Sequence, residues 1–182
     1  RSGRNAVLIV FVTQIPLWIW IHRWVGDIAF VGWIGLGLYM SIWAPLFVLL
    51  LRRIQLNKAF PKVSIVFAAP IVWVGLECVR GIILFDGYPW YLVGTGIVDT
   101  PFARVASYGS VWLASFVVVM FAAALAAMKS VKRQTWFMFV LVGLCLLMTT
   151  GPKHTRFIGF TVAVVQTNVP QSNKVAWTWD RQ

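Results

Sequence analysis

Two oppositely charged residues, Glu77 and Arg80, lie three positions apart near the end of a long apolar segment. On a helix this spacing brings both side chains to one face, close enough to form an ion pair. Charged groups at membrane depth are costly and are typical of functional sites or watery cavities. Long charged side chains near a helix end also reach the membrane surface and act only as anchors. From spacing alone, both explanations are equally good.

An aromatic segment follows this pair, with the sequence FDGYPWY at positions 85–91. Gly87 and Pro89 interrupt a helix, and Pro89 favours an extended conformation at Tyr88. Together with Trp90, these residues predict an irregular loop at the outer membrane surface. Such backbone is tolerated in a membrane only where it packs on protein or lines a wet cavity. The alternative is an aromatic belt, because Trp and Tyr are enriched at membrane interfaces in general.

The other reactive side chains form no catalytic or metal-binding pattern in the sequence. Cys78 and Cys145 lie in hydrophobic segments, where a thiol is inert. His22 and His154 are isolated and have no Cys or carboxylate at metal-ligand spacing. The sequence also lacks a glycine-rich phosphate loop, and it predicts no cofactor and no metal.

The composition indicates a membrane protein. The 182 residues are 60% hydrophobic and 12% charged, with 11 Trp and 13 Phe, whereas soluble domains are about half apolar and about a quarter charged. These values exclude a soluble enzyme and a disordered chain, and two Cys are too few for a disulfide-stapled module. The net charge of +11 is explained as a topology signal, so no nucleic-acid partner is expected.

Five apolar segments are long enough to cross a bilayer, which takes roughly 17 to 25 residues in a helix. They cover residues 5–21, 28–51, 63–85, 105–128 and 135–151. Glycines in the second segment and alanines in the fourth allow close approach of neighbouring helices. We therefore predict an α-helical polytopic membrane protein, with a transmembrane helical bundle over residues 1–151.

The basic residues predict the orientation of this bundle. Nine Lys and Arg and no acidic residue fall before the first span or in the connections after the second and fourth, and the positive-inside rule places these parts in the cytoplasm. The nine are Arg1, Arg4, Arg52, Arg53, Lys58, Lys62, Lys129, Lys132 and Arg133. The other side holds seven basic residues and all five acidic ones. The segment after residue 151 is therefore expected outside the cytoplasm.

The chain changes character after Gly151 and Pro152. Residues 157–165, with the sequence FIGFTVAVV, are apolar and β-branched, and a polar run follows them. This pattern is typical of a buried strand in an α/β core, although a short helical segment has the same periodicity. We expect a first strand at 160–166 and the start of a truncated soluble domain at 152–182. The chain begins with Arg, and we expect it to be a piece of a longer protein.

Two motifs resemble the apolipoprotein N-acyltransferase family of bacterial inner-membrane enzymes. The first is similar to the family pattern AP..W…E..RG…GFPW…G; it comprises Ala69, Pro70, Trp73, Glu77, Arg80, Gly81, Gly87, Tyr88, Pro89, Trp90 and Gly94. The second covers residues 164–171 and is similar to VQGNIPQ, the opening of the family's nitrilase-like domain. Tyr88 replaces the commoner Phe, and Thr167 replaces Gly. A family Trp after this motif corresponds to Trp177 or Trp179, and Trp177 is slightly preferred.

The resemblance implies a multi-pass protein of the bacterial inner membrane with a periplasmic carbon-nitrogen hydrolase domain. It implies transfer of a fatty acyl chain from a membrane phospholipid to the N-terminal amine of diacylglyceryl-cysteine in apolipoproteins. The family uses a Cys nucleophile, a Glu base and a Lys that stabilises the oxyanion. None of the three matches a position here, so the chain by itself is expected to be inactive. Supporting or lipid-binding roles carry over to Glu77, Arg80, Gly87, Tyr88, Pro89, Trp90 and Trp177.

Two other classes of function remain open at this point. A small transporter or channel would use Glu77 and Arg80 to line a polar path. Corresponding breaks in two halves of the chain would favour it, and only one such break is visible. The other class is a non-catalytic scaffold that handles lipoproteins in the bilayer.

Overall fold

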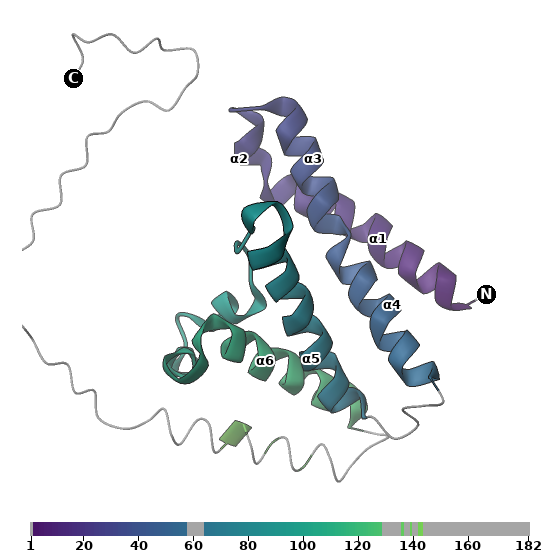
Figure 1. The fold of residues 1–182 in the computed structure, drawn as a ribbon, viewed down its shortest axis with the longest axis vertical. Coiled ribbons are helices and arrows are strands. Elements are labelled where there is room, and N and C mark those ends of the chain that lie inside the picture. Colours follow the sequence, from purple (N-terminus) through teal and green to yellow (C-terminus); the bar gives the residue numbers. More distant parts are fainter. Residues whose placement is uncertain (1, 58–63, 129–135, 137–138, 140–141, 144–182) are drawn as a thin grey trace, which may run out of the picture.

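The computed structural model describes residues 2–57, 64–128, 136, 139, 142 and 143 (Figure 1). The regular elements of this part are all helical. They are α1 (Ser2–Ile21), α2 (Arg23–Gly26), α3 (Phe30–Ser41), α4 (Trp43–Leu56), α5 (Ile65–Cys78) and α6 (Ala106–Ala127). The predicted strand at 160–166 and Trp177 lie outside the described residues. Of the predicted span at 135–151, only residues 136, 139, 142 and 143 are described, and they are helical.

Four helical segments of the described part are long and apolar enough to cross a membrane. They are Gly3–Ile21, Phe30–Leu56, Ile65–Asp86 and Pro101–Ala127. These segments match the first four predicted spans to within a few residues, and the polytopic helical architecture is confirmed for this part of the chain. The second segment combines α3 and α4, which are separated at Ile42. Pro45 explains the break, because it has no N–H to donate to the carbonyl of Ser41.

The apolar core lies mainly between α5 and α6 (Figure 1). From α5, Val66, Ala68 and Ala69 are buried, and α6 contributes side chains that include Ala124 and Met120. Small side chains at such a contact let two helix backbones come close together, which favours dispersion contacts in a membrane. The alanine-rich sequence of the fourth predicted span therefore supplies the packing face of α6.

The helices bring together residues that the charge pattern assigns to the same side. Arg4 of α1 and Arg52 of α4 line one groove, at the start of the first span and the end of the second. At the other end of α1, His22 contacts Tyr88 from the segment after α5. These contacts agree with spans that alternate in direction. Which end faces the cytoplasm stays a prediction.

Short irregular turns connect α5 to α6. They are the π-helix η1 (Val79–Ile83) and the 3-10 turns η2 (Leu84–Asp86), η3 (Val93–Ile97) and η4 (Pro101–Val105). The prediction of an irregular segment around positions 85–91 is confirmed. We call residues 84–100 the aromatic loop.

Candidate functional site

The aromatic loop begins with a sharp reversal of the chain. Three consecutive residues, 85–87, have positive φ angles, and Gly87 has φ +92°. A Cβ atom at Gly87 would collide with the carbonyl oxygen of Gly81, so only glycine fits there. The next N–H, that of Tyr88, donates to the carbonyl of Arg80 at 2.8 Å. The loop is thereby folded back onto η1, next to the two charged residues.

Glu77 binds the aromatic loop at Val93 through its carboxylate. Its side chain is 2% exposed, at the end of α5. The Oε1 atom accepts a hydrogen bond from the backbone N–H of Val93 at 2.7 Å and another from Nε1 of Trp73 at 2.9 Å. A buried carboxylate needs such donors because it has lost its hydration. Glu77 therefore fixes one helix side chain and one loop position together.

Arg80 binds the same part of the loop by donating hydrogen bonds to backbone carbonyls. Its side chain is 4% exposed, and its Nη1 donates to the carbonyl oxygen of Trp90 at 2.7 Å. Weaker contacts at 3.4 Å reach the carbonyl of Tyr91 and the sulfur of Met40. Because a guanidinium has several donors in a fixed plane, one side chain can hold two adjacent carbonyls.

Among the described residues, Glu77 and Arg80 do not form the ion pair that their spacing allows. Each binds loop backbone instead, Glu77 at Val93 and Arg80 at Trp90 and Tyr91. Arg80 lies in the π-helix η1 and not in the regular helix α5. Two buried charges of opposite sign thus hold neighbouring loop residues, the anion through an N–H and the cation through carbonyls.

A small cavity lies beside these two side chains. Its volume is about 40 Å³, and its lining includes Glu77, Arg80, Trp43 and Gln14. The Oε2 atom of Glu77 and Nε1 of Trp43 are buried without a hydrogen-bond partner among the described residues. A space of this size beside two unpartnered polar atoms fits a few water molecules, each of which needs roughly 10–15 Å³. It is too small for an acyl chain.

Tyr88 connects the loop to the end of α1 through His22. The Tyr88 hydroxyl lies 3.0 Å from Nε2 of His22, and Nδ1 of this fully buried ring lies 2.9 Å from the carbonyl of Trp18. Because a carbonyl only accepts, Nδ1 donates, and in the neutral ring Nε2 accepts from Tyr88. Burial and the neighbouring Tyr91 raise the pKa of Tyr88 to about 12, while Arg80 opposes the shift. The phenol is therefore protonated at physiological pH.

Aromatic packing reinforces this connection. The ring centroids of His22 and Tyr91 are 5.1 Å apart, and those of Trp18 and Tyr91 are 5.7 Å apart, both edge-on. Edge-to-face pairs of this kind add about 0.5–1.5 kcal/mol beyond the burial of their area. The last turn of α1 is thus packed against the loop.

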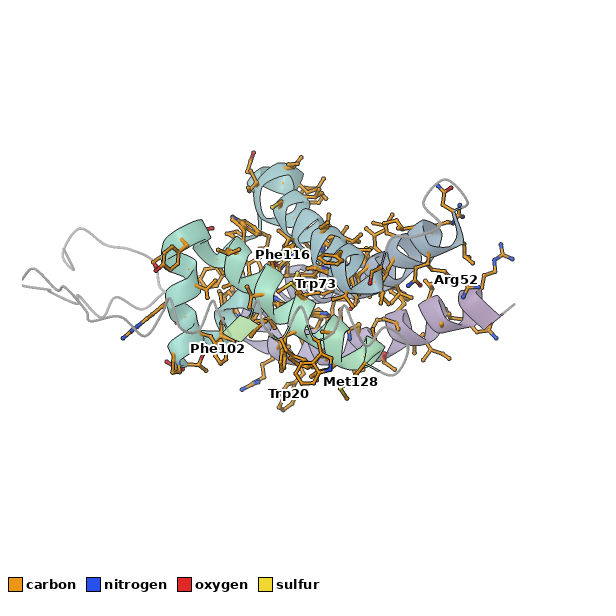
Figure 2. The ribbon with its side chains drawn as sticks, turned by 90° about the horizontal axis from the view of Figure 1, so that it is seen from below. Trp20, Arg52, Trp73, Phe102, Phe116 and Met128 are labelled. Atoms are coloured by element: carbon orange, nitrogen blue, oxygen red, sulfur yellow. The ribbon has the colours of Figure 1, made fainter. Side chains whose placement is uncertain are left out.

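The predicted site residues that the structure describes range from buried to exposed. Glu77 and Arg80 are buried beneath the loop, and Gly87 and Tyr88, which are half-buried, belong to the loop itself. Pro89 and the Trp90 side chain lie outside, and Trp90 is 65% exposed although its carbonyl binds Arg80. In Figure 2, Trp73 lies among the helices, whereas Trp20, which is 66% exposed, points away from them.

Sequence reasoning missed His22, which is not isolated in the fold, and Ser115. His22 follows Trp18 by four positions at a helix end, and this spacing was the available signal. Ser115 of α6 accepts a hydrogen bond from the N–H of Gly94 at 2.8 Å. No pattern in the sequence indicates this long-range contact. Together, these residues attach the aromatic loop to α1 and α6 as well as to α5.

The contact between Tyr88 and His22 predicts an energetic coupling. Tyr88→Phe and His22→Ala are each expected to destabilise the full-length protein, and the double variant is expected to lose less than the sum. The coupling should be about 0.5–1.5 kcal/mol, the usual net value of one hydrogen bond. Unfolding of the purified protein in detergent measures it. Strictly additive losses would contradict the contact.

The part of the chain that holds this site matches a known family. Residues 1–124 match the family described as apolipoprotein N-acyltransferase N-terminal domain. The chain belongs to this family. The matched region includes the whole aromatic loop and all of its helical attachments through Ser115. Together, the apolar helices and the apolipoprotein N-acyltransferase family support a multi-pass protein of the inner membrane.

Curated relatives agree with this family. The chain is similar to an apolipoprotein N-acyltransferase of Rhodopirellula baltica, with 32% identity over 105 residues, 53% of this chain and 18% of that protein. It is 30% identical to the Pseudomonas syringae protein of the same name over 179 residues, 91% of this chain and 34% of the relative. The chain thus spans about a fifth to a third of these relatives. No solved structure matches it.

Proposed function

We propose that this chain is the membrane part of an enzyme that transfers a fatty acyl chain from a membrane phospholipid to the N-terminal amine of diacylglyceryl-cysteine in apolipoproteins. Membership of the apolipoprotein N-acyltransferase family supports the reaction class. In this proposal the nucleophilic Cys, its Glu base and the oxyanion-stabilising Lys belong to a periplasmic domain beyond these residues. The chain alone is then inactive, and the role of residues 1–128 is to present the lipid.

The observation that carries the proposal is the way in which buried charges hold an exposed aromatic loop. Arg80 fixes the backbone at Trp90, and Glu77 fixes it at Val93. The Trp90 side chain nevertheless stays exposed, and Ile83 and Phe85 nearby in the sequence are 68% and 83% exposed. A rigid loop with an apolar outer face suits contact with acyl chains, whereas an anchor needs no such fixed backbone.

In this proposal the loop binds and orients the acyl donor and takes no part in the chemical step. Exposed Trp and apolar side chains bind lipid tails, and a fixed backbone limits the orientations that a bound lipid can adopt. With the positive-inside orientation, the loop lies on the periplasmic side, where the proposed catalytic domain would meet the lipid. Glu77 and Arg80 are positioning residues in this scheme.

Trp90→Ala tests the proposal in the full-length protein. We expect acyl transfer per molecule to fall about tenfold, equivalent to about 1.4 kcal/mol of transition-state stabilisation, because a lipid contact is lost. Abundance in the membrane should not change, since an exposed side chain leaves no buried cavity. Transfer to a synthetic diacylglyceryl peptide and quantitative immunoblotting measure the two quantities.

Trp20→Ala is the matched control, because Trp20 is 66% exposed and Trp90 is 65% exposed. Trp20 lies on α1 with the Arg23 guanidinium 4.8 Å from the centre of its ring, and its side chain points away from the helices (Figure 2). This variant is expected to keep wild-type transfer. Equal losses in both variants, or a loss of abundance without a loss of transfer per molecule in Trp90→Ala, would assign Trp90 to membrane anchoring.

A further inference from the structure

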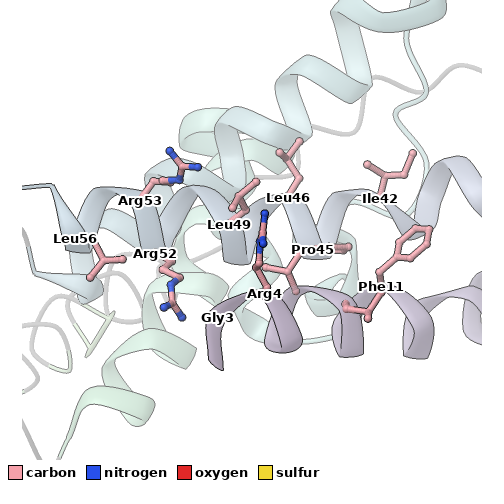
Figure 3. A pocket seen from close by; sticks show the side chains of 12 residues that line it. Gly3, Arg4, Phe11, Ile42, Pro45, Leu46, Leu49, Arg52, Arg53 and Leu56 are labelled. Carbon is pink, nitrogen blue, oxygen red and sulfur yellow. The ribbon is translucent and has the colours of Figure 1, made fainter. Parts of the chain in front are cut away.

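A second cavity lies at the other end of α1, between α1 and α4 (Figure 3). It is an open groove of about 600 Å³, within the usual range of small-molecule sites. Its walls are apolar, with Leu8 and Phe11 from α1 and Leu46 and Leu49 from α4. This volume and lining suit a lipid tail.

Three arginines line the same groove. Arg52 and Arg53 lie toward the end of α4, Arg4 projects from the first turns of α1, and Phe11 lies farther along the groove (Figure 3). All three arginines are exposed. No acidic side chain lines the groove, and α1 and α4 contain none. The acidic residues that the structure describes are Asp27, Glu77, Asp86 and Asp99.

Three positive charges with no acidic side chain beside them among the described residues favour an anionic partner. A guanidinium binds phosphate oxygens through two parallel N–H groups, and adjacent arginines can share one phosphate. Basic clusters at the ends of membrane helices attract anionic headgroups in the same way. The groove therefore combines an anion-binding end with an apolar channel.

We propose that this groove binds one anionic glycerophospholipid of the adjacent leaflet. Its phosphate lies among Arg4, Arg52 and Arg53, and one acyl chain follows the apolar wall toward Phe11. The charge orientation places this leaflet on the cytoplasmic side. A zwitterionic lipid is disfavoured because its ammonium group adds a fourth positive charge. The lipid joins α1 to α4 at the end opposite the aromatic loop, so it is distinct from an acyl donor at Trp90.

The test compares lipid binding by the full-length protein purified in a neutral detergent. Native mass spectrometry with added phosphatidylglycerol or phosphatidylethanolamine should show at least about tenfold preference for the anionic lipid, because the ammonium group of phosphatidylethanolamine adds a positive charge beside the three arginines. The triple variant Arg4→Gln, Arg52→Gln, Arg53→Gln should lose this preference. Arg23→Gln removes an exposed arginine at the other end of α1 and should keep it.

A second variant keeps the charges and fills the groove. Leu49→Trp places a large ring in the apolar channel, and it should reduce retention of phosphatidylglycerol while leaving the arginines in place. Inorganic phosphate alone should neither bind with similar affinity nor displace the lipid. The readout is equilibrium binding, so its result does not depend on acyl transfer.

Several outcomes overturn the proposal. Equal retention of the two lipids by the wild-type protein would remove the anionic preference. If Arg23→Gln lowered the preference for phosphatidylglycerol as much as the triple variant, the preference would come from the net charge of the protein and not from the groove. Competition by phosphate would indicate a free-phosphate site. Unchanged retention in both groove variants would mean that the lipid binds elsewhere on the full-length protein.

Discussion

Glu77→Ala is expected to abolish most acyl transfer by the full-length protein and to lower its abundance. The substitution leaves the N–H of Val93 and Nε1 of Trp73 without their shared acceptor. Each unpaired buried donor costs about 1–3 kcal/mol. Because the carboxylate is 2% exposed, bulk water cannot take its place without a local rearrangement of the loop. Acyl transfer per molecule and membrane abundance should both fall.

Glu77→Gln separates hydrogen bonding from charge. The Gln side-chain oxygen can occupy the position of Oε1 and accept from Val93 and Trp73 as before. If the residue acts by holding the loop, this variant should keep near-wild-type abundance and most of its transfer activity. A Gln variant as inactive as the Ala variant would show that the negative charge itself is required. Limited proteolysis within the aromatic loop should report its release in the Ala variant alone.

Hydropathy predicted the helical spans because a membrane helix is defined by length and apolar composition, both of which are visible in the sequence. Four of the five predicted spans have counterparts in the described residues. The break at Ile42 was not predicted, although Pro45 is its cause. A proline within an otherwise continuous apolar run is easily treated as tolerated, since neighbouring helices can satisfy the freed carbonyl.

The candidate site was only partly predictable for a different reason. The cost of burying charge singled out Glu77 and Arg80, and the glycine at position 87 predicted a turn. Their partners, however, are the backbone groups of Trp90 and Val93, and every residue has such groups. The spacing of the two residues therefore favoured an ion pair. In the structure, Arg80 lies in the π-helix η1, and both side chains contact the loop instead. The contact between His22 and Tyr88 joins residues 66 positions apart and has no local signature.

Gly94→Ala is expected to be as damaging as Glu77→Ala, although it adds only a methyl group. Gly94 is buried against α6, and its N–H donates to Ser115 Oγ at 2.8 Å. An added Cβ would lie 2.6 Å from the backbone nitrogen of Ser115 and 2.9 Å from the Cβ of Ala114. These atoms belong to a helix packed on α5, so they cannot shift alone. Overpacking of this kind costs about 1–3 kcal/mol.

Gly96→Ala is the control for this substitution, because it makes the same chemical change in the same 3-10 turn. No atom lies within 4 Å of a Cβ placed at Gly96, and its φ angle is not positive. This variant should therefore retain wild-type abundance and acyl transfer. The abundance and acyl transfer of Ser115→Ala should lie between those of the two glycine variants, since this substitution leaves the N–H of Gly94 unpaired without a clash. If Gly94→Ala and Gly96→Ala behaved alike, α6 would not fix the loop, and Glu77 and Arg80 alone would hold it in place.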